Sequence, residues 1–163
     1  TFEEYRDIVQ RLRAAMPDIA ISTDIIVGFP DETEEEFQMT LDAMEEFQFD
    51  SAFMFAYSER EGTYASKKIE DNIPPEVKAD RLQRLINLQN DITIRKNEAR
   101  IGQIETILIE SPAKRGPEHW CGRTEHFKNA IIPAFEGIHP GMLVKMKVET
   151  CSISTLYGRR VED

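Results

Sequence analysis

The chain has 163 residues, enough for one domain or two small ones, and its formal net charge is −10. The charge is uneven: residues 1–99 hold 11 Lys and Arg against 22 Asp and Glu, whereas residues 100–163 hold 9 against 8. The first part therefore repels nucleic acid, and the last part is the better partner for a polyanion. The sequence contains no apolar run long enough to cross a membrane and no signal-peptide pattern at its start, so we expect no membrane partner.

The beginning of the chain predicts a helix followed by a strand. Apolar side chains at helical spacing predict a helix over residues 2–16, which Pro17 ends. Residues 19–27 predict a strand, and the apolar run 25–27 at its end is typical of a parallel strand buried on both faces.

A second helix and strand follow. Residues 33–49 predict a helix in which Thr33 and Glu36 form a capping box, and residues 51–57 predict an apolar strand. Alternating helices and strands predict an α/β protein with a parallel sheet. Two strands do not form a stable sheet alone, so we expect a fragment of a larger TIM-like barrel whose other strands precede Thr1. The exposed sheet edge then predicts self-association of the fragment.

The turn after the first strand is a candidate ligand site. Gly28 and Pro30 stop the strand before the next helix begins. In parallel α/β folds ligands lie outside the carboxyl ends of the strands, where Asp24 and residues 28–32 are expected. Arg60 is expected just past the end of the second strand, in an irregular loop over residues 58–73.

The second half of the chain changes in character. Residues 74–100 predict a long connecting helix. Five short strands separated by Gly and Pro then predict a small antiparallel, OB-like β-barrel, over residues 103–110, 119–125, 130–133, 143–150 and 154–158. Cys121 and Cys151 lie in this part and are too few for a disulfide framework, so we expect reduced thiols and a cytoplasmic protein.

Three motifs resemble those of the radical-SAM methylthiotransferases, and they lie at residues 24–33, 57–63 and 122–125. Residues 49–53 look most like the tRNA-modifying branch of that family. The resemblance implies the C-terminal part of an enzyme that adds a methylthio group to C2 of isopentenylated adenosine next to the anticodon. Residues 1–99 would be the end of the radical-SAM barrel with its connecting helix. Residues 100–163 would be a TRAM domain that binds the tRNA anticodon stem-loop.

The resemblance also implies the cofactors, which are S-adenosylmethionine and two 4Fe-4S clusters in the full-length parent. A cluster needs closely spaced cysteines, which this chain lacks. We therefore expect no catalytic residue and no metal ligand here, no cofactor bound to the fragment, and no activity without the N-terminal part of the same enzyme. The expected cofactor-binding residues are Asp24, Gly28, Phe29, Pro30, Tyr57, Ser58 and Arg60.

The expected RNA-binding residues lie in the predicted barrel. Cations can pair with phosphates, and an exposed ring can stack on a splayed base of a single-stranded loop. Alternating side chains place Lys145 and Lys147 on one face of a strand. The full set is Lys114, Arg115, Arg123, Phe127, Lys128, Lys145 and Lys147.

The chain departs from the family pattern at several positions. Asp31 stands where a Gly is usual, and Glu59, Glu61 and Tyr64 stand where Pro is usual or common. A positive φ at residue 31 would strain most side chains, although Asp tolerates it better than most. Fewer prolines predict a looser loop.

Other functions remain open besides this one. One sister branch of the family modifies threonylcarbamoyl-adenosine on tRNA, and residues 49–53 argue mildly against it. Another sister branch modifies an aspartate of a ribosomal protein, and would use the TRAM domain to bind protein. The chain could also be a stand-alone RNA-binding module without catalysis. A small α/β enzyme with its own site is the last, and no nucleophile–base pair in the sequence supports it.

Overall fold

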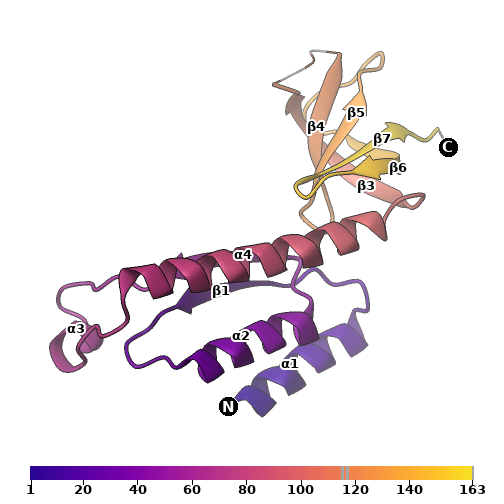
Figure 1. Ribbon diagram of the computed structural model, residues 1–163. Helices are drawn as coiled ribbons and strands as arrows, with labels where there is room; N and C mark the ends of the chain where they lie inside the picture. The colour runs from indigo at the N-terminus through magenta and orange to yellow at the C-terminus, as the bar shows by residue number, and fades with distance from the viewer. Residues whose placement is uncertain (115, 117, 163) are drawn as a thin grey trace. The chain divides into compact units, whose positions relative to one another are not determined.

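The computed structural model describes residues 1–114, 116 and 118–162, and the chain divides into two compact units, Thr1–Ile92 and Thr93–Asp163. The first unit contains α1 (Phe2–Ala15), β1 (Ser22–Val27), α2 (Glu34–Phe47), β2 (Ser51–Ala56), α3 (Tyr64–Lys68) and most of α4 (Pro75–Glu98) (Figure 1). The second contains the end of α4, β3 (Ile104–Pro112), β4 (His119–Thr124), β5 (Asn129–Pro133), β6 (Leu143–Cys151) and β7 (Thr155–Arg160). The predicted helices and strands occur in the predicted order, and one further helix, α3, lies between β2 and α4.

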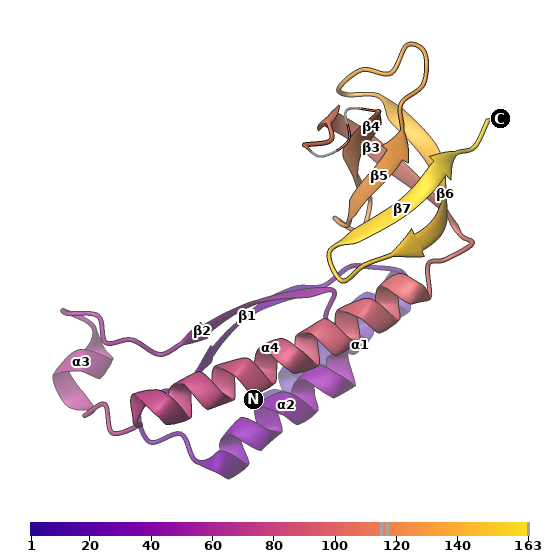
Figure 2. The same ribbon diagram turned by 45° about the horizontal axis from the view of Figure 1, so that its top comes forward.

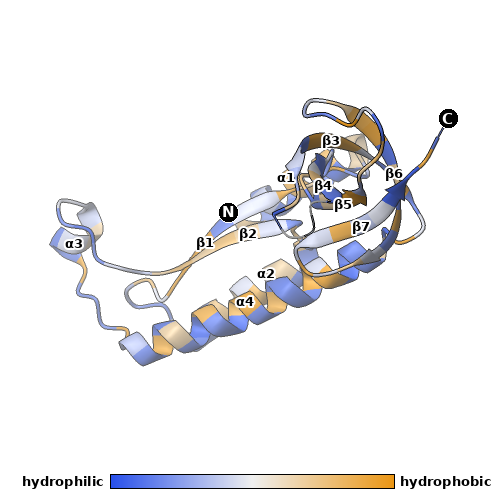
Figure 3. Cartoon of the chain, turned by 90° about the horizontal axis from the view of Figure 1, so that it is seen from above, coloured by the Kyte–Doolittle hydropathy of each residue, from blue (hydrophilic) through white to orange (hydrophobic). Residues whose placement is uncertain are grey.

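The strands β1 and β2 form a two-stranded parallel sheet in which Asp24 lies opposite Phe53. Helices α1, α2 and α4 contribute to one core, and the alternating burial of β1 and β2 places this core on a single face of the sheet. Figure 3 shows α2 and α4 running along the same side of the two strands. The other face is exposed; it carries Asp24, Ile26, Phe53 and Phe55, and Phe53 is 62% exposed. The expectation that the first strand is buried on both faces is therefore wrong for the described residues, because the helices cover only one side.

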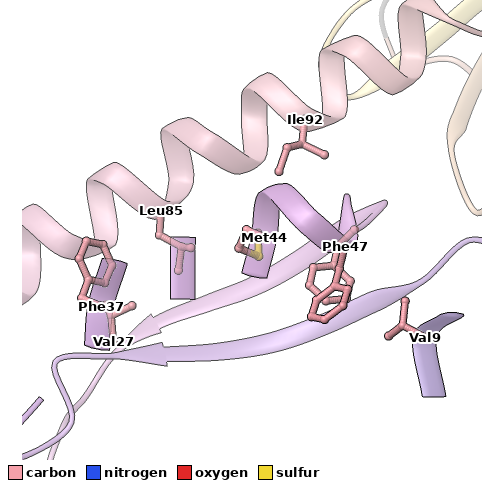
Figure 4. Packing of buried hydrophobic residues seen from close by; sticks show 8 residues of the cluster. Val9, Val27, Phe37, Met44, Phe47, Leu85 and Ile92 are labelled. Atoms are coloured by element: carbon pink, nitrogen blue, oxygen red, sulfur yellow. The ribbon is translucent and has the colours of Figure 1, made fainter. Parts of the chain in front are cut away.

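The core of the first unit joins three helices to the covered sheet face. Phe37, Met44 and Phe47 form the buried stripe of α2, as their spacing predicts. Leu85 and Ile92, seven residues apart on α4, point toward α2 (Figure 4). Burying one side chain of this size contributes about 1.5–3 kcal/mol, so this cluster is the main source of stability of the unit.

Capping side chains fix where two helices begin. The Thr33 hydroxyl accepts from the Glu36 amide (3.2 Å) and the Glu36 carboxylate accepts from the Thr33 amide (2.9 Å), which confirms the predicted capping box of α2. The loop predicted over residues 58–73 contains a short helix, α3, that the sequence analysis missed. Thr63 caps it by accepting from the Ser66 amide.

The five strands of the second unit close into a barrel in the order β3-β4-β5-β7-β6 (Figure 2). Four neighbouring pairs are antiparallel, but β5 and β7 are parallel. The expectation of a purely antiparallel barrel is therefore wrong. Five strands cannot alternate in direction around a closed ring, so at least one neighbouring pair must be parallel.

Candidate functional site

The carboxyl ends of β1 and β2 bring together residues from two of the three motifs. The Tyr57 amide donates to the Val27 carbonyl (2.8 Å), which extends the pairing of the strands by one residue. The rings of Phe29 and Tyr57 meet edge to face, with centroids 5.1 Å apart. Gly28, between Val27 and Phe29, has a φ of +69° that favours glycine. The predicted site residues Gly28, Phe29 and Tyr57 are therefore neighbours.

Asp31 adopts the conformation that the sequence analysis identified as costly. Its φ is +67°. The turn is held by Asn72, which lies between α3 and α4: the Asp31 amide donates to Asn72 Oδ1 (2.9 Å), and Asn72 Nδ2 donates to Asp31 Oδ1 (2.6 Å). These two bonds hold the aspartate in a conformation that favours glycine.

The remaining predicted cofactor-binding residues lie around this turn. Pro30, within the turn, is buried. Asp24 is exposed on the open face of the sheet, three residues before the end of β1. Ser58 and Arg60 are exposed in the segment after β2, where the Arg60 carbonyl accepts from Thr63. The structure therefore does not gather all seven residues into one cluster.

Sequence analysis missed the polar residues that hold the turn from behind. Glu32 Oε2 accepts from the Gly28 amide (2.6 Å) and from Arg81 Nη1 of α4 (2.8 Å). Lys78, also of α4, donates to both carboxylate oxygens of Asp71 at 2.6 Å. The sequence does contain a sign of this role. Lys78 and Arg81 lie seven and four residues before Leu85 in α4, where helical spacing predicts a buried apolar side chain, so a cation there indicates a buried ion pair.

A groove of about 850 Å³ lies beside the covered face of the same sheet, next to α1 and α2. Ile25, Phe47 and Phe49 contribute apolar surface, and Glu36, Asp42 and Glu46 contribute carboxylates. The Arg6 guanidinium, which bonds Glu46, lowers the pKa of that carboxyl. Because acidic side chains repel anions, this groove is a poor site for RNA.

The barrel carries a stacked pair of side chains at the third motif, of which Phe127 is exposed and Arg123 is half-buried. Phe127 lies in the β4–β5 turn with a φ of +59°, and its side chain is 75% exposed. The guanidinium carbon of Arg123 lies 4.3 Å from the centroid of the Phe127 ring, and Arg123 Nε donates to Glu110 Oε1 (3.2 Å). This arrangement presents a cation and an aromatic ring together at the surface.

The other predicted RNA-binding residues lie on different parts of the barrel. Lys145 and Lys147 are both exposed on one face of β6, as their alternation predicts. Lys114 is exposed after β3, and Lys128 is half-buried in the β4–β5 turn. Arg115 lies outside the described residues.

Exposed aliphatic side chains lie between these cations. Arg123 is opposite Leu108 in the β3–β4 pair, and Leu108 is opposite Leu143 in the β3–β6 pair. Both leucines are exposed. In the same ladder Ile104 lies opposite Lys147. This part of the outer wall of the barrel therefore mixes basic and aliphatic side chains.

A buried polar cluster anchors the turn that carries Phe127. Glu105 Oε1 accepts from Arg100 Nη1 (2.7 Å), and Glu105 Oε2 lies 3.4 Å from His126 Nδ1. His126 was predicted to have a surface or structural role, and its side chain is only 12% exposed. Arg100 pairs with the buried Glu105 carboxylate, whose charge would be costly to bury alone, and the contact of the same carboxylate with His126 places the turn beside the barrel.

The two thiols of the barrel are free. Burial, and to a smaller extent the Glu98 carboxylate, raise the pKa of the Cys151 thiol. Among the described residues no group of three or more His, Cys, Asp or Glu side chains could hold a metal ion. Within the same residues, no helix is long and apolar enough to span a bilayer.

The described fold thus joins a two-stranded parallel α/β unit, with an aromatic pair at its strand ends, to a closed mixed β-barrel with exposed cations. No protein-family model matches the chain. Over its whole length the chain is 45% identical to a Parabacteroides distasonis protein named tRNA-2-methylthio-N(6)-dimethylallyladenosine synthase, and covers 35% of that protein.

Two further relatives carry the same name. The Bacillus cytotoxicus protein is 42% identical over 100% of this chain and 32% of its own length, and the Akkermansia muciniphila protein is 42% identical over 96% and 34%. The chain therefore spans about a third of the length of the curated relatives it matches. These relatives confirm the resemblance that the three motifs predicted.

Proposed function

We propose that this chain is the C-terminal part of a longer tRNA methylthiotransferase, which adds a methylthio group to C2 of isopentenylated adenosine next to the anticodon. The observation that carries this proposal is the similarity along the whole chain, at 42–45% identity, to relatives whose name states that product. Their names refer to tRNA and give no support to the ribosomal-protein alternative. An enzyme that modifies tRNA would act in the cytoplasm.

On this proposal residues 1–99 complete a TIM-like radical-SAM barrel and residues 100–163 form the TRAM domain. The apolar, exposed sheet face with Ile26, Phe53 and Phe55 supports the first assignment, because such a face suits the interior of a larger barrel. Further strands from the N-terminal part of the enzyme would pair with the free edge of the sheet. Without them, the same edge would drive self-association of the fragment.

The residues at the strand ends fit S-adenosylmethionine in part. The Phe29 ring, 42% exposed, offers an aromatic surface to adenine, and Tyr57 supports that ring edge to face. Asp24 and Arg60 are exposed and offer opposite charges to the ammonium and carboxylate of the methionine part. Gly28 and Pro30 shape the turn. When bound beside an iron–sulfur cluster, S-adenosylmethionine supplies the radical chemistry, and the cluster cysteines would lie outside these 163 residues.

The barrel would hold the tRNA anticodon stem-loop. Phe127, stacked with Arg123, would receive an unpaired base of the loop, because aromatic side chains stack on splayed bases. Lys145 and Lys147 would contact phosphates, with Lys114, Arg115 and Lys128 as further cations. Phosphate contacts position the RNA, and base contacts select the loop.

The test is product analysis with the full-length protein that carries this sequence. The protein, with its iron–sulfur clusters reconstituted, is incubated with a one-electron reductant, S-adenosylmethionine, a sulfur donor and tRNA bearing isopentenyladenosine. Nucleoside mass spectrometry is expected to find the methylthio derivative, and unisopentenylated tRNA serves as the matched control. No methylthio derivative on isopentenylated tRNA, together with a methylthio group on a ribosomal-protein aspartate when that protein is supplied instead, would contradict the proposal.

A further inference from the structure

Two basic side chains of α4 are buried behind the strand ends. The Lys78 side chain is 10% exposed and the Arg81 side chain is 5% exposed. Burying a charge is costly unless the charge is paired and hydrogen-bonded. The groups that these two cations bond therefore indicate which part of the structure they stabilise.

Arg81 holds the turn that follows β1. Its Nη1 donates to the Glu32 carbonyl oxygen (3.0 Å) and to Glu32 Oε2 (2.8 Å). The same Oε2 accepts from the Gly28 amide (2.6 Å). The Glu32 carboxylate thus links the first residue of the turn to α4, and the turn is closed at both its beginning and its end.

Lys78 contacts the ends of both strands. Its Nζ bonds Asp71, lies 3.4 Å from the Tyr57 carbonyl oxygen and lies 5.1 Å from the centroid of the Tyr57 ring. Its stem fills the space beside Gly28: a Cβ added to Gly28 would lie 2.5 Å from Lys78 Cγ. The stem therefore closes one side of the turn, and the ammonium group fixes Tyr57.

We propose that Lys78 and Arg81 are positioning residues for S-adenosylmethionine binding, which hold the Gly28 turn and Tyr57 in the arrangement that pairs the Phe29 and Tyr57 rings. This inference rests on the proposed function. The two cations act through the turn from the α4 side and bond protein groups. Removing either one frees the turn, so binding must then restore its order at a cost in affinity.

The test measures S-adenosylmethionine affinity by equilibrium binding to the full-length protein with reconstituted clusters. Arg81→Gln and Lys78→Met are each expected to raise Kd about tenfold or more, because a displaced site loses preorganised contacts. The KM for S-adenosylmethionine should rise likewise, with kcat at saturation changed much less.

Arg84→Gln is the matched control. Arg84 lies on the same helix, pairs with Glu34 (2.6 Å) and stacks on the Phe37 ring (4.6 Å), as Arg81 does at 5.6 Å. Its partners among the described residues lie outside the turn, so its Kd should stay within about twofold of the unaltered protein. Equal weakening in Arg84→Gln and Arg81→Gln, or no weakening in Arg81→Gln and Lys78→Met, would overturn the positioning role.

A second measurement covers the case in which Arg81→Gln does not fold. Glu32→Gln keeps an oxygen near the Gly28 amide but loses the ion pair with Arg81 that holds this oxygen in place. Arg81 keeps its contact with Glu34 (3.4 Å), so the variant should weaken binding without unfolding the core. Amide hydrogen exchange at Gly28 should be faster in Glu32→Gln and unchanged in Arg84→Gln. Unchanged exchange in both variants would refute the role of the Glu32–Arg81 pair in holding the Gly28 turn. If the unaltered protein itself does not bind S-adenosylmethionine, the proposed function fails, whereas normal binding by the turn variants refutes only the positioning role.

Discussion

Asp31 illustrates how single residues of the turn are stabilised by distant neighbours. Its positive φ of 67° is a conformation that costs an ordinary L-residue about 1–2 kcal/mol. Asn72, 41 residues further along the chain, bonds both its amide and its carboxylate. The sequence suggests strain at residue 31, because the motif that it resembles usually has glycine at this position. The sequence does not reveal that Asn72 is the residue that stabilises the turn.

Replacing Asp31 separates strain from hydrogen bonding. Asp31→Ala keeps the strain and loses the carboxylate, so it should lower the free energy of unfolding by about 1–2 kcal/mol. Asp31→Gly loses the same carboxylate without the strain and should lower it by about 1 kcal/mol less. Urea denaturation followed by circular dichroism measures both; equal loss in the two variants would show that φ at this residue carries no cost.

At the scale of elements, local signals explain most of what could be predicted. Apolar spacing located α1, α2 and α4, and the Thr33–Glu36 capping box located the start of α2. The contacts of Lys78 and Arg81 could not be predicted in this way, since Arg81 and Glu32 are 49 residues apart. Barrel closure depends likewise on pairing between distant strands, which periodicity does not specify.

Gly122, the first residue of the third motif, allows β4 to approach β3 closely. A Cβ at Gly122 would lie 2.2 Å from the Leu108 carbonyl oxygen, a backbone atom that cannot turn away. Gly122→Ala should therefore destabilise the barrel by about 3 kcal/mol. Gly102→Ala is the control: its φ is +86° but no atom lies within 4 Å, so only backbone strain of about 1–2 kcal/mol is expected.

The fluorescence of Trp120 measures this effect selectively. It is the single tryptophan of the chain and packs against the barrel core, so its urea transition reports the barrel. A transition that is the same in Gly122→Ala and the unaltered chain would show that β4 can move away from β3 without cost, contrary to the close packing in the structure.

At the scale of the whole molecule, the net charge is distributed unevenly between the two parts of the chain. Residues 1–99 carry a net charge of −11, and residues 100–163 carry +1. The RNA contact is therefore expected on the barrel, where Arg123 and Phe127 are stacked at the surface. Sequence could nominate these two residues, but their contact depends on the positive φ of Phe127 in the β4–β5 turn.

The most direct test is binding of the 163-residue chain to a tRNA anticodon stem-loop at two salt concentrations. Binding should weaken as the salt concentration rises, and Arg123→Ala should reduce the affinity about five- to tenfold. The slope of the logarithm of affinity against the logarithm of salt concentration should fall by about one in this variant. Arg11→Ala removes the same charge from α1, where Arg11 pairs with Asp7, and should leave affinity nearly unchanged. Absence of binding even at low salt, or equal effects of Arg123→Ala and Arg11→Ala, would contradict the assignment of the barrel as the tRNA-binding part.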